Sequence, residues 1–331
     1  MIGYYVHHHG RGHLSRAIAI AAALDRPVTG LSSLPAPRGW RGEWVRLPMD
    51  DAASPRDAEG RGRLHWVPLG DEGLRARMAR VARWIDERQP SALVVDVSVE
   101  VALLARLHGV PVVVIAMPGQ RTDAAHELGY AIAEAVIGTW PPEATGLLEG
   151  LPPLGGRLHA VGAIARFGPT PTAARPPVGA RRVVVLGGAG GDTFTADAVG
   201  RARDATPGWE WTHLGANGSW TDDPWAALLT ASVVVTHAGE GAIAEVAATR
   251  RPAIVIPQPR PHDEQHRTAA VLADASWPAI VLSGWPSAGW PSLLDDAAAL
   301  DASGWQRWND GDGARRAAAV IAAACEPGAM P

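Results

Sequence analysis

Lysine is absent from this chain, and all 30 of its basic residues are arginine. Walker-type phosphate-binding loops and pyridoxal phosphate enzymes both depend on a lysine amine. The absence of lysine therefore excludes both of these protein classes.

Cysteine is almost absent as well, since Cys325 is the one copy in 331 residues. A single thiol cannot form an internal disulfide or a cysteine metal cluster, which favours a reducing, cytoplasmic setting. The sequence also has no apolar run long enough for a transmembrane helix, and its N-terminus has no basic region followed by an apolar stretch, as a signal peptide would. We therefore expect a protein that is neither exported nor membrane-spanning. The net charge of -4 provides no basic field for nucleic acid.

Metal-binding motifs are not recognisable among the twelve histidines. Consecutive side chains of an extended strand point to opposite faces, so His7, His8 and His9 cannot all reach one ion. The HExxH and C-x-x-C spacings do not occur. The sequence therefore predicts no metal site and no cofactor.

Short apolar runs alternate with helical patterns, which predicts an α/β fold with parallel sheets. The length suits two domains of roughly 150 residues each. A proline-rich stretch indicates a linker at 166–181, between an N-terminal domain at 1–165 and a C-terminal domain at 182–331. The clearest expected strands are Ile2–Val6, Ala92–Val95, Pro111–Ala116, Val183–Leu186, Trp209–Leu214, Ser232–Thr236 and Ala253–Ile256, and the clearest helices Leu14–Leu24, Leu74–Arg88, Val99–Leu107, Gly241–Thr249 and Gly313–Ala324.

Gly10-Arg11-Gly12-His13 joins the first expected strand to a helix. Unpaired N–H groups at a helix start favour an anion or a polar ligand, and glycines allow its close approach. His13 can accept a proton from a hydroxyl near neutral pH, although it could equally cap the helix. Asp96 ends the strand LVVD, where its carboxylate could orient His13 or instead cap the next helix, a role for which Glu100 competes.

THAGEGAIAE, residues 236–245, is the most specific motif in the chain. A strand leads into a glycine turn and then a helix, whose first N–H groups are suited to a diphosphate. His237 adds a donor beside the phosphates, and the Glu245 carboxylate could accept two hydrogen bonds from a ribose. The proline-rich loop that follows ends in Asp263 and Gln265, which suit a sugar, although helix capping would also account for them.

The order of these features resembles the donor-binding signature of GT-B glycosyltransferases: a glycine loop, then THAGxGxxxE, then a proline-rich loop with Asp-x-Gln. The families most similar are the lipid-II-forming N-acetylglucosaminyltransferase and the plant secondary-product glucosyltransferases. With the N-terminal GxGH, the resemblance spans nearly the whole chain. It implies two Rossmann-like domains that face each other across a cleft.

The resemblance also implies roles for the matching residues. His13 would be the base, assisted by Asp96, Glu245 would bind the ribose, and Asp263 with Gln265 would bind the transferred sugar. The residues assigned to the donor diphosphate are Gly12, Gly188, Gly190, His237, Glu240, Gly241 and Ala242. Two departures are Ala242, where relatives often have a hydroxyl, and Ala269, where an asparagine is frequent.

The expected activity is therefore inverting, metal-independent transfer of a sugar from a nucleotide diphosphate sugar to a hydroxyl-bearing acceptor. A UDP-sugar is the favoured donor and a dTDP-sugar is an alternative, and the acceptor is a small molecule or a lipid-linked one, which would bring the protein to the periphery of a membrane. Arg121, Asp123 and His126 could line the acceptor side, or serve only capping and surface pairing. Competing functions are a nucleotide-sugar epimerase or hydrolase, and a catalytically silent binding subunit.

Overall fold

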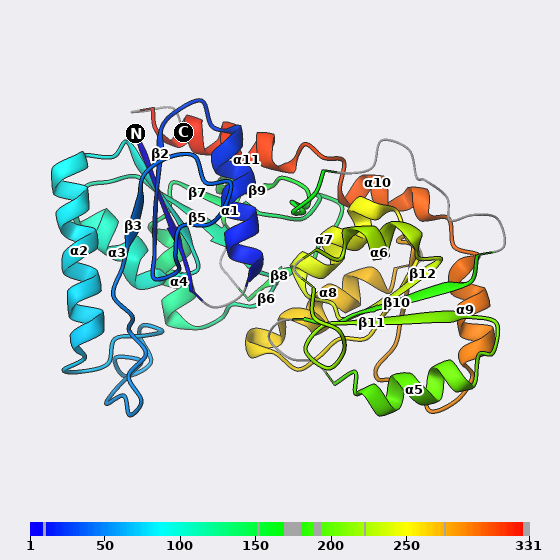
Figure 1. The fold of residues 1–331 in the computed structure, drawn as a ribbon. Helices are drawn as coiled ribbons and strands as arrows, with labels where there is room; N and C mark the ends of the chain where they lie inside the picture. The colour runs from blue at the N-terminus through cyan, green and yellow to red at the C-terminus, as the bar shows by residue number, and fades with distance from the viewer. Residues whose placement is uncertain are drawn as a thin grey trace.

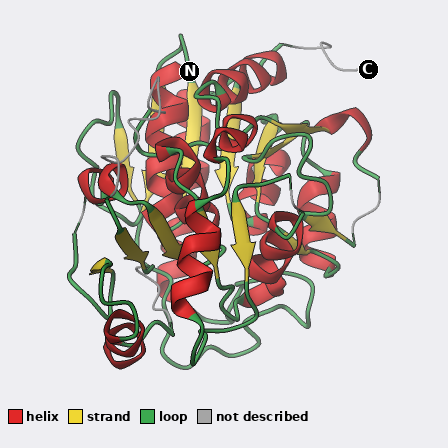
Figure 2. Cartoon of the chain, turned by 90° about the vertical axis from the view of Figure 1, so that its right-hand side faces the viewer, coloured by secondary structure: helices red, strands yellow, loops and turns green. Residues whose placement is uncertain are grey.

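The computed structural model describes residues 1–8, 11–150, 153–168, 180–188, 193–221, 223–274 and 276–326. Two parallel β-sheets lie side by side, each with helices on both faces (Figure 1). Figure 2 shows strands of this fold enclosed between helices. The predicted α/β fold with two Rossmann-like halves is confirmed.

The first sheet has seven parallel strands in the order β3-β2-β1-β4-β5-β7-β9. Val6 at the end of one strand pairs with Asp96 at the end of its neighbour, so the carboxyl ends of the central strands meet at one edge. The strands are β1 (Ile2–Val6), β2 (Val28–Ser32), β3 (Trp44–Arg46), β4 (Ala92–Asp96), β5 (Val112–Ala116), β7 (Ala135–Gly138) and β9 (Leu158–Ala160).

Helices α1 (Arg11–Ala23) and α11 (Gly313–Ala324) cover one face of this sheet. The other face packs against α2 (Glu72–Arg88), α3 (Val99–Leu107) and α4 (Ala124–Ala131). Helix α1 begins before the predicted Leu14, so His13 lies in its first turn.

The second sheet has five parallel strands in the order β11-β10-β12-β13-β14. Helices α5 and α9 pack on one face, and α6, α7 and α8 on the other. The strands are β10 (Arg182–Leu186), β11 (Glu210–Leu214), β12 (Val233–Thr236), β13 (Ala253–Val255) and β14 (Ala279–Val281). The helices are α5 (Ala196–Asp204), α6 (Trp225–Thr230), α7 (Glu240–Thr249), α8 (Glu264–Leu272) and α9 (Trp290–Ala298).

Helix α11 packs on the first sheet, although chain order had assigned it to the second domain (Figure 1). Its apolar side chains Ala317 and Ile321 are fully buried in one cluster with Ile20 of α1 and Val94 of β4. Burial of this face against the first sheet, rather than position in the sequence, decides where the helix lies. The rest of the predicted domain division stays a prediction, and most of the linker, 169–179, lies outside the described residues.

A two-stranded parallel ribbon of β6 (Gly119–Gln120) and β8 (Leu148–Glu149) contacts the second half through η2 (Pro261–Asp263), and a Cβ on Gly119 would lie only 2.5 Å from the carbonyl oxygen of His262. The other short elements are η1 (Gly155–Arg157), η3 (Ala302–Gly304) and α10 (Trp305–Trp308). None of the helices described is both long enough and apolar enough to cross a bilayer.

Candidate active site

A cavity of about 320 Å³ lies between the two halves, where the carboxyl ends of their parallel strands face each other. Open α/β sheets bind ligands at this edge. Most predicted site residues line the cavity: Gly12, His13, Gly188, His237, Glu240, Gly241, Ala242, Glu245 and Gln265. Gly190 lies outside the described residues.

His13 and Asp96 form the predicted pair. Nδ1 of His13 lies 2.8 Å from Oδ1 of Asp96, which is fully buried behind the imidazole. Nδ1 also lies 3.0 Å from NH2 of Arg16, but that group donates to Oδ1 of Asp96 at the shorter distance of 2.8 Å. An ionised carboxylate can only accept a hydrogen bond, so Nδ1 carries the ring proton and Nε2 presents its lone pair. The pair thus has the arrangement required of a general base and its orienting acid.

Arg16, which the sequence analysis overlooked, binds the same carboxylate. Its Nε and NH2 groups donate to the two oxygens of Asp96, at 3.1 and 2.8 Å. Its third nitrogen, NH1, lies 2.5 Å from Oε1 of Glu240, which also accepts from the hydroxyl of Thr139. Arg16 is only 5% exposed, so this ion pair joins the two halves in a buried setting.

Electrostatics keep Asp96 ionised. Burial would raise the pKa of its carboxyl, but the Arg16 guanidinium and the His13 ring lower that pKa from 3.8 to about 2. Burial would likewise lower the pKa of Arg16, yet the carboxylates of Asp96 and Glu240 raise it. Two carboxylates around one guanidinium leave one negative charge in excess beside the His13 ring.

Asp96 does not cap the next helix. The side chain of Ser98 accepts from the N–H of Val101 and is the N-cap of α3, while Glu100 accepts from the N–H groups of His65 and Trp66. Val97, between the buried acid and this cap, has φ +65°. A β-branched residue in the left-handed region is a strained outlier, of the kind that clusters at functional sites.

Helix α7 begins at the cavity. Ile243 donates the first intrahelical bond to the carbonyl of Gly239. The N–H groups of residues 240–242 therefore have no acceptor within the helix, as at any helix start. Gly241 and Ala242 line the cavity at this point, which suits an anionic ligand.

His237 lies beside this helix start. The N–H of Gly239 donates to its Nδ1 at 3.0 Å, so a neutral imidazole carries its proton on Nε2. A Cβ on Gly188 would approach Nε2 to 2.8 Å. The His237 donor thus faces Gly188 in the loop after β10, and a side chain at position 188 would force the His237 ring to move.

Glu245 is buried along the cavity wall, one and a half turns into α7. Its Oε1 accepts from Nε of Arg166 at 2.6 Å. Arg166 was not among the predicted site residues; it comes from the predicted linker and lines the same cavity. A ribose that binds Glu245 must share this carboxylate with Arg166.

The predicted sugar-binding segment divides in two. Gln265 is 2% exposed, lines the cavity and accepts from the N–H of Gln258 at 2.9 Å. Asp263 is exposed instead, pairs with Nδ1 of His266 at 2.8 Å and is not among the cavity-lining residues. Glu264 is the acid of this segment that faces the cavity, and burial raises its pKa.

The predicted acceptor-side residues Arg121, Asp123 and His126 lie outside this cavity, in a separate cluster. Asp123 is the N-cap of α4 and accepts from the N–H of His126 at 3.0 Å. Its capping role, one of the two alternatives for this residue, is confirmed.

Comparison with known proteins gives the family. A sequence model of the glycosyltransferase family 28 C-terminal domain matches residues 219–282, which include α7 and the segment with Gln265. The UDP-N-acetylglucosamine--N-acetylmuramyl-(pentapeptide) pyrophosphoryl-undecaprenol N-acetylglucosamine transferase of Sorangium cellulosum is 31% identical over 304 residues, 78% of this chain and 73% of that protein. The chain belongs to this family of GT-B glycosyltransferases.

Solved structures agree with this glycosyltransferase fold. A UDP-glucosyltransferase from Polygonum tinctorium superposes with a TM-score of 0.69 at 15% identity, covering 98% of each chain. Acinetobacter baumannii MurG gives 0.62 at 15% identity, covering 97% of this chain and 98% of that one. The predicted resemblance and the predicted nucleotide-sugar glycosyltransferase activity are confirmed, and the alternatives of an epimerase, a hydrolase or a silent subunit are not favoured.

Proposed function

We propose that this glycosyltransferase moves N-acetylglucosamine from its UDP conjugate to a hydroxyl of a lipid-linked pyrophosphate acceptor, by a single inverting displacement. The observation that carries the proposal is the shared cavity, lined by His13 from one half and by the start of α7 from the other. The donor and acceptor are those named for the Sorangium cellulosum relative. An acceptor of this kind places the reaction at a membrane surface.

In the proposed reaction, Nε2 of His13 removes the proton of the acceptor hydroxyl. The acceptor oxygen bonds to the anomeric carbon as the bond from that carbon to the diphosphate oxygen breaks, and UDP leaves with the electron pair. Attack from the face opposite the leaving group inverts the anomeric configuration. Asp96 holds the imidazole and balances the charge that it gains.

The departing diphosphate is held by the N–H groups at the start of α7 and by Nε2 of His237, which supports transfer without a divalent cation at the diphosphate. Gly12, Gly188 and Gly190 are proposed to allow close approach of the phosphates. Glu245 is proposed for the ribose and Gln265 for the sugar, whereas Asp263 lies outside the cavity and is not assigned to the sugar.

A product assay tests this function. The protein is incubated with UDP-N-acetylglucosamine alone, and then with the lipid-linked acceptor added. Transfer predicts that UDP appears only with acceptor, together with a β-linked disaccharide lipid from the α-linked donor, at a rate that added Mg²⁺ does not change. UDP release with donor alone would indicate hydrolysis, and a changed sugar on intact UDP would indicate epimerisation. A thermal-shift comparison of UDP with dTDP resolves the nucleotide.

A further inference from the structure

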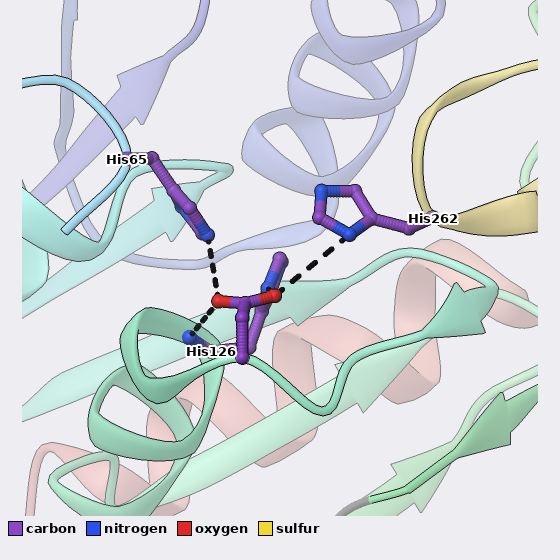
Figure 3. Close-up of side chains that lie close together, drawn as sticks. His65, His126 and His262 are labelled. Atoms are coloured by element: carbon purple, nitrogen blue, oxygen red, sulfur yellow. Dashed lines mark hydrogen bonds and ion pairs between the residues drawn. The ribbon is translucent and has the colours of Figure 1, made fainter. Parts of the chain in front are cut away.

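Three histidines and one aspartate lie together beside the cavity, and the proposed transfer reaction uses none of them. His65, Asp123, His126 and His262 each offer one ligand atom, and these atoms all lie within 4.8 Å of one another. Figure 3 shows the three imidazoles arranged around a central carboxylate.

The carboxylate of Asp123 is the centre of the cluster. Its Oδ1 lies 3.0 Å from Nε2 of His65. Its Oδ2 lies 2.6 Å from Nδ1 of His126 and 3.8 Å from Nδ1 of His262. A single ion pair would need one imidazole beside this carboxylate, whereas three are present.

The four residues come from three separate segments. His65 belongs to the long loop before α2, and Asp123 with His126 to the start of α4, all in the first half. His262 belongs to η2 in the second half. The cluster therefore lies where the two halves meet, next to Gly119, on which a Cβ would lie 2.5 Å from the His262 carbonyl oxygen.

We propose that these four side chains bind one Zn²⁺ ion, through three imidazole nitrogens and one carboxylate oxygen. Imidazole and carboxylate are ordinary zinc ligands at about 2.0–2.2 Å, and four protein ligands complete a tetrahedral, structural site. Such tetrahedral ligands are about 3.3–3.5 Å apart, so the present spacings need adjustments of roughly 1 Å. With no open position, the ion clamps the two halves instead of activating water.

The backbone at η2 fits this role. His262 and Asp263 have φ of +58° and +56°, two consecutive non-glycine residues in the left-handed region. Such residues are strained and persist where the surroundings hold them, often at ligand clamps. Coordination by His262 would hold this turn, and with it Glu264 and Gln265 at the cavity wall.

Arg121 sets a condition on zinc binding. Its NH1 lies 3.2 Å from Nε2 of His126, and a guanidinium can only donate, so Nδ1 carries the proton in the metal-free protein. Ligation through Nδ1 moves that proton to Nε2, and Arg121 must then turn away. Oε2 of Glu264, 4.0 Å from its NH2 group, offers an acceptor. Arg121→Gln, whose amide oxygen can accept from Nε2–H, should therefore tighten zinc binding.

The test uses the full chain without a histidine tag, after EDTA has removed bound metal. The protein is titrated with Zn²⁺, and separately with Co²⁺, whose visible absorption reports tetrahedral coordination. The expected result is one ion per chain. His65→Ala and His262→Ala should each weaken binding by at least about 100-fold, since loss of even an outer partner costs 10–100-fold. Asp123→Asn should do the same without loss of the α4 cap, because asparagine caps as well as aspartate.

His108→Ala is the matched control, since His108 is an exposed histidine at the end of α3 and outside the cluster. It should bind zinc as the unaltered protein does. Zinc should also slow amide hydrogen exchange at 62–67 and 260–266 in the unaltered protein, but not in His65→Ala. Absence of binding, or binding that either His65→Ala or His262→Ala leaves unchanged, would overturn the proposal. The measurements need no nucleotide or acceptor, so they stand apart from the transferase assay.

Discussion

Arg16→Met should destabilise the protein far more than loss of an ordinary ion pair. The substitution keeps an apolar side chain of similar length but removes the guanidinium that Asp96 and Glu240 share. Both carboxylates would then be buried without their cation. Removing one partner of a buried ion pair typically costs about 3–5 kcal/mol.

The pKa of Asp96 gives a second route to the magnitude. It falls from 3.8 to about 2 in the folded protein, and one pKa unit corresponds to about 1.36 kcal/mol. The ionised form of Asp96 therefore stabilises the fold by roughly 2.5 kcal/mol, an order-of-magnitude value. This contribution is complete above pH 4 and is lost as the pH falls from about 4 to about 2. Without Arg16, burial is no longer offset and the pKa of Asp96 rises. Once that pKa exceeds 3.8, ionised Asp96 destabilises the fold, so the acid-side loss disappears and stability increases as the pH falls through the raised pKa.

The assay is urea unfolding followed by circular dichroism between pH 2 and pH 8, on the unaltered protein and on two variants. Arg182→Met is the matched control, because Arg182 pairs with Glu210 at 2.9 Å but both side chains are exposed. Exposed pairs contribute about 0–1 kcal/mol. Equal losses for the two variants, or an unchanged pH profile for Arg16→Met, would refute the reasoning.

Two further predictions concern the donor side of the cavity. Glu245→Ala should weaken UDP binding by about 1–3 kcal/mol, as for a lost hydrogen-bonding carboxylate, and calorimetry that finds unchanged affinity would remove the ribose role. Gly188→Val should weaken UDP binding at least about tenfold and change unfolding little, because its side chain would displace the end of the His237 ring, whose Nε2 lies 2.8 Å from the position of a Cβ. A Gly188→Val protein that binds UDP normally would show that this loop does not approach the phosphates.

The sheet framework could be predicted from the sequence because its strands are short, valine-rich runs bounded by glycine turns or proline. Val233–Thr236 and Ala253–Val255 lie where expected, within one residue. The final helix was assigned to the wrong sheet, because chain order says nothing about which apolar face Ile321 meets. The start of α1 was placed too late, since glycine and polar residues in a first turn resemble a loop.

The site was partly predictable for a similar reason. Asp96 ends one strand and His13 follows another, so the shared edge of a parallel sheet brings them together. Arg16 could have been found, because three residues after His13 it lies on the same face of the helix. The cluster that contains His65 and His262 could not have been predicted, because nearly two hundred residues separate these histidines and no spacing motif marks long-range contacts.

His13→Ala tests the central claim most directly, with UDP affinity and single-turnover transfer measured on the same protein. We predict that the transfer rate falls by roughly 10²–10⁴-fold, the usual contribution of a general base, while UDP affinity stays unchanged. Transfer at the unaltered rate with normal UDP binding would contradict the account, because His13 would then not be the base that faces the donor site.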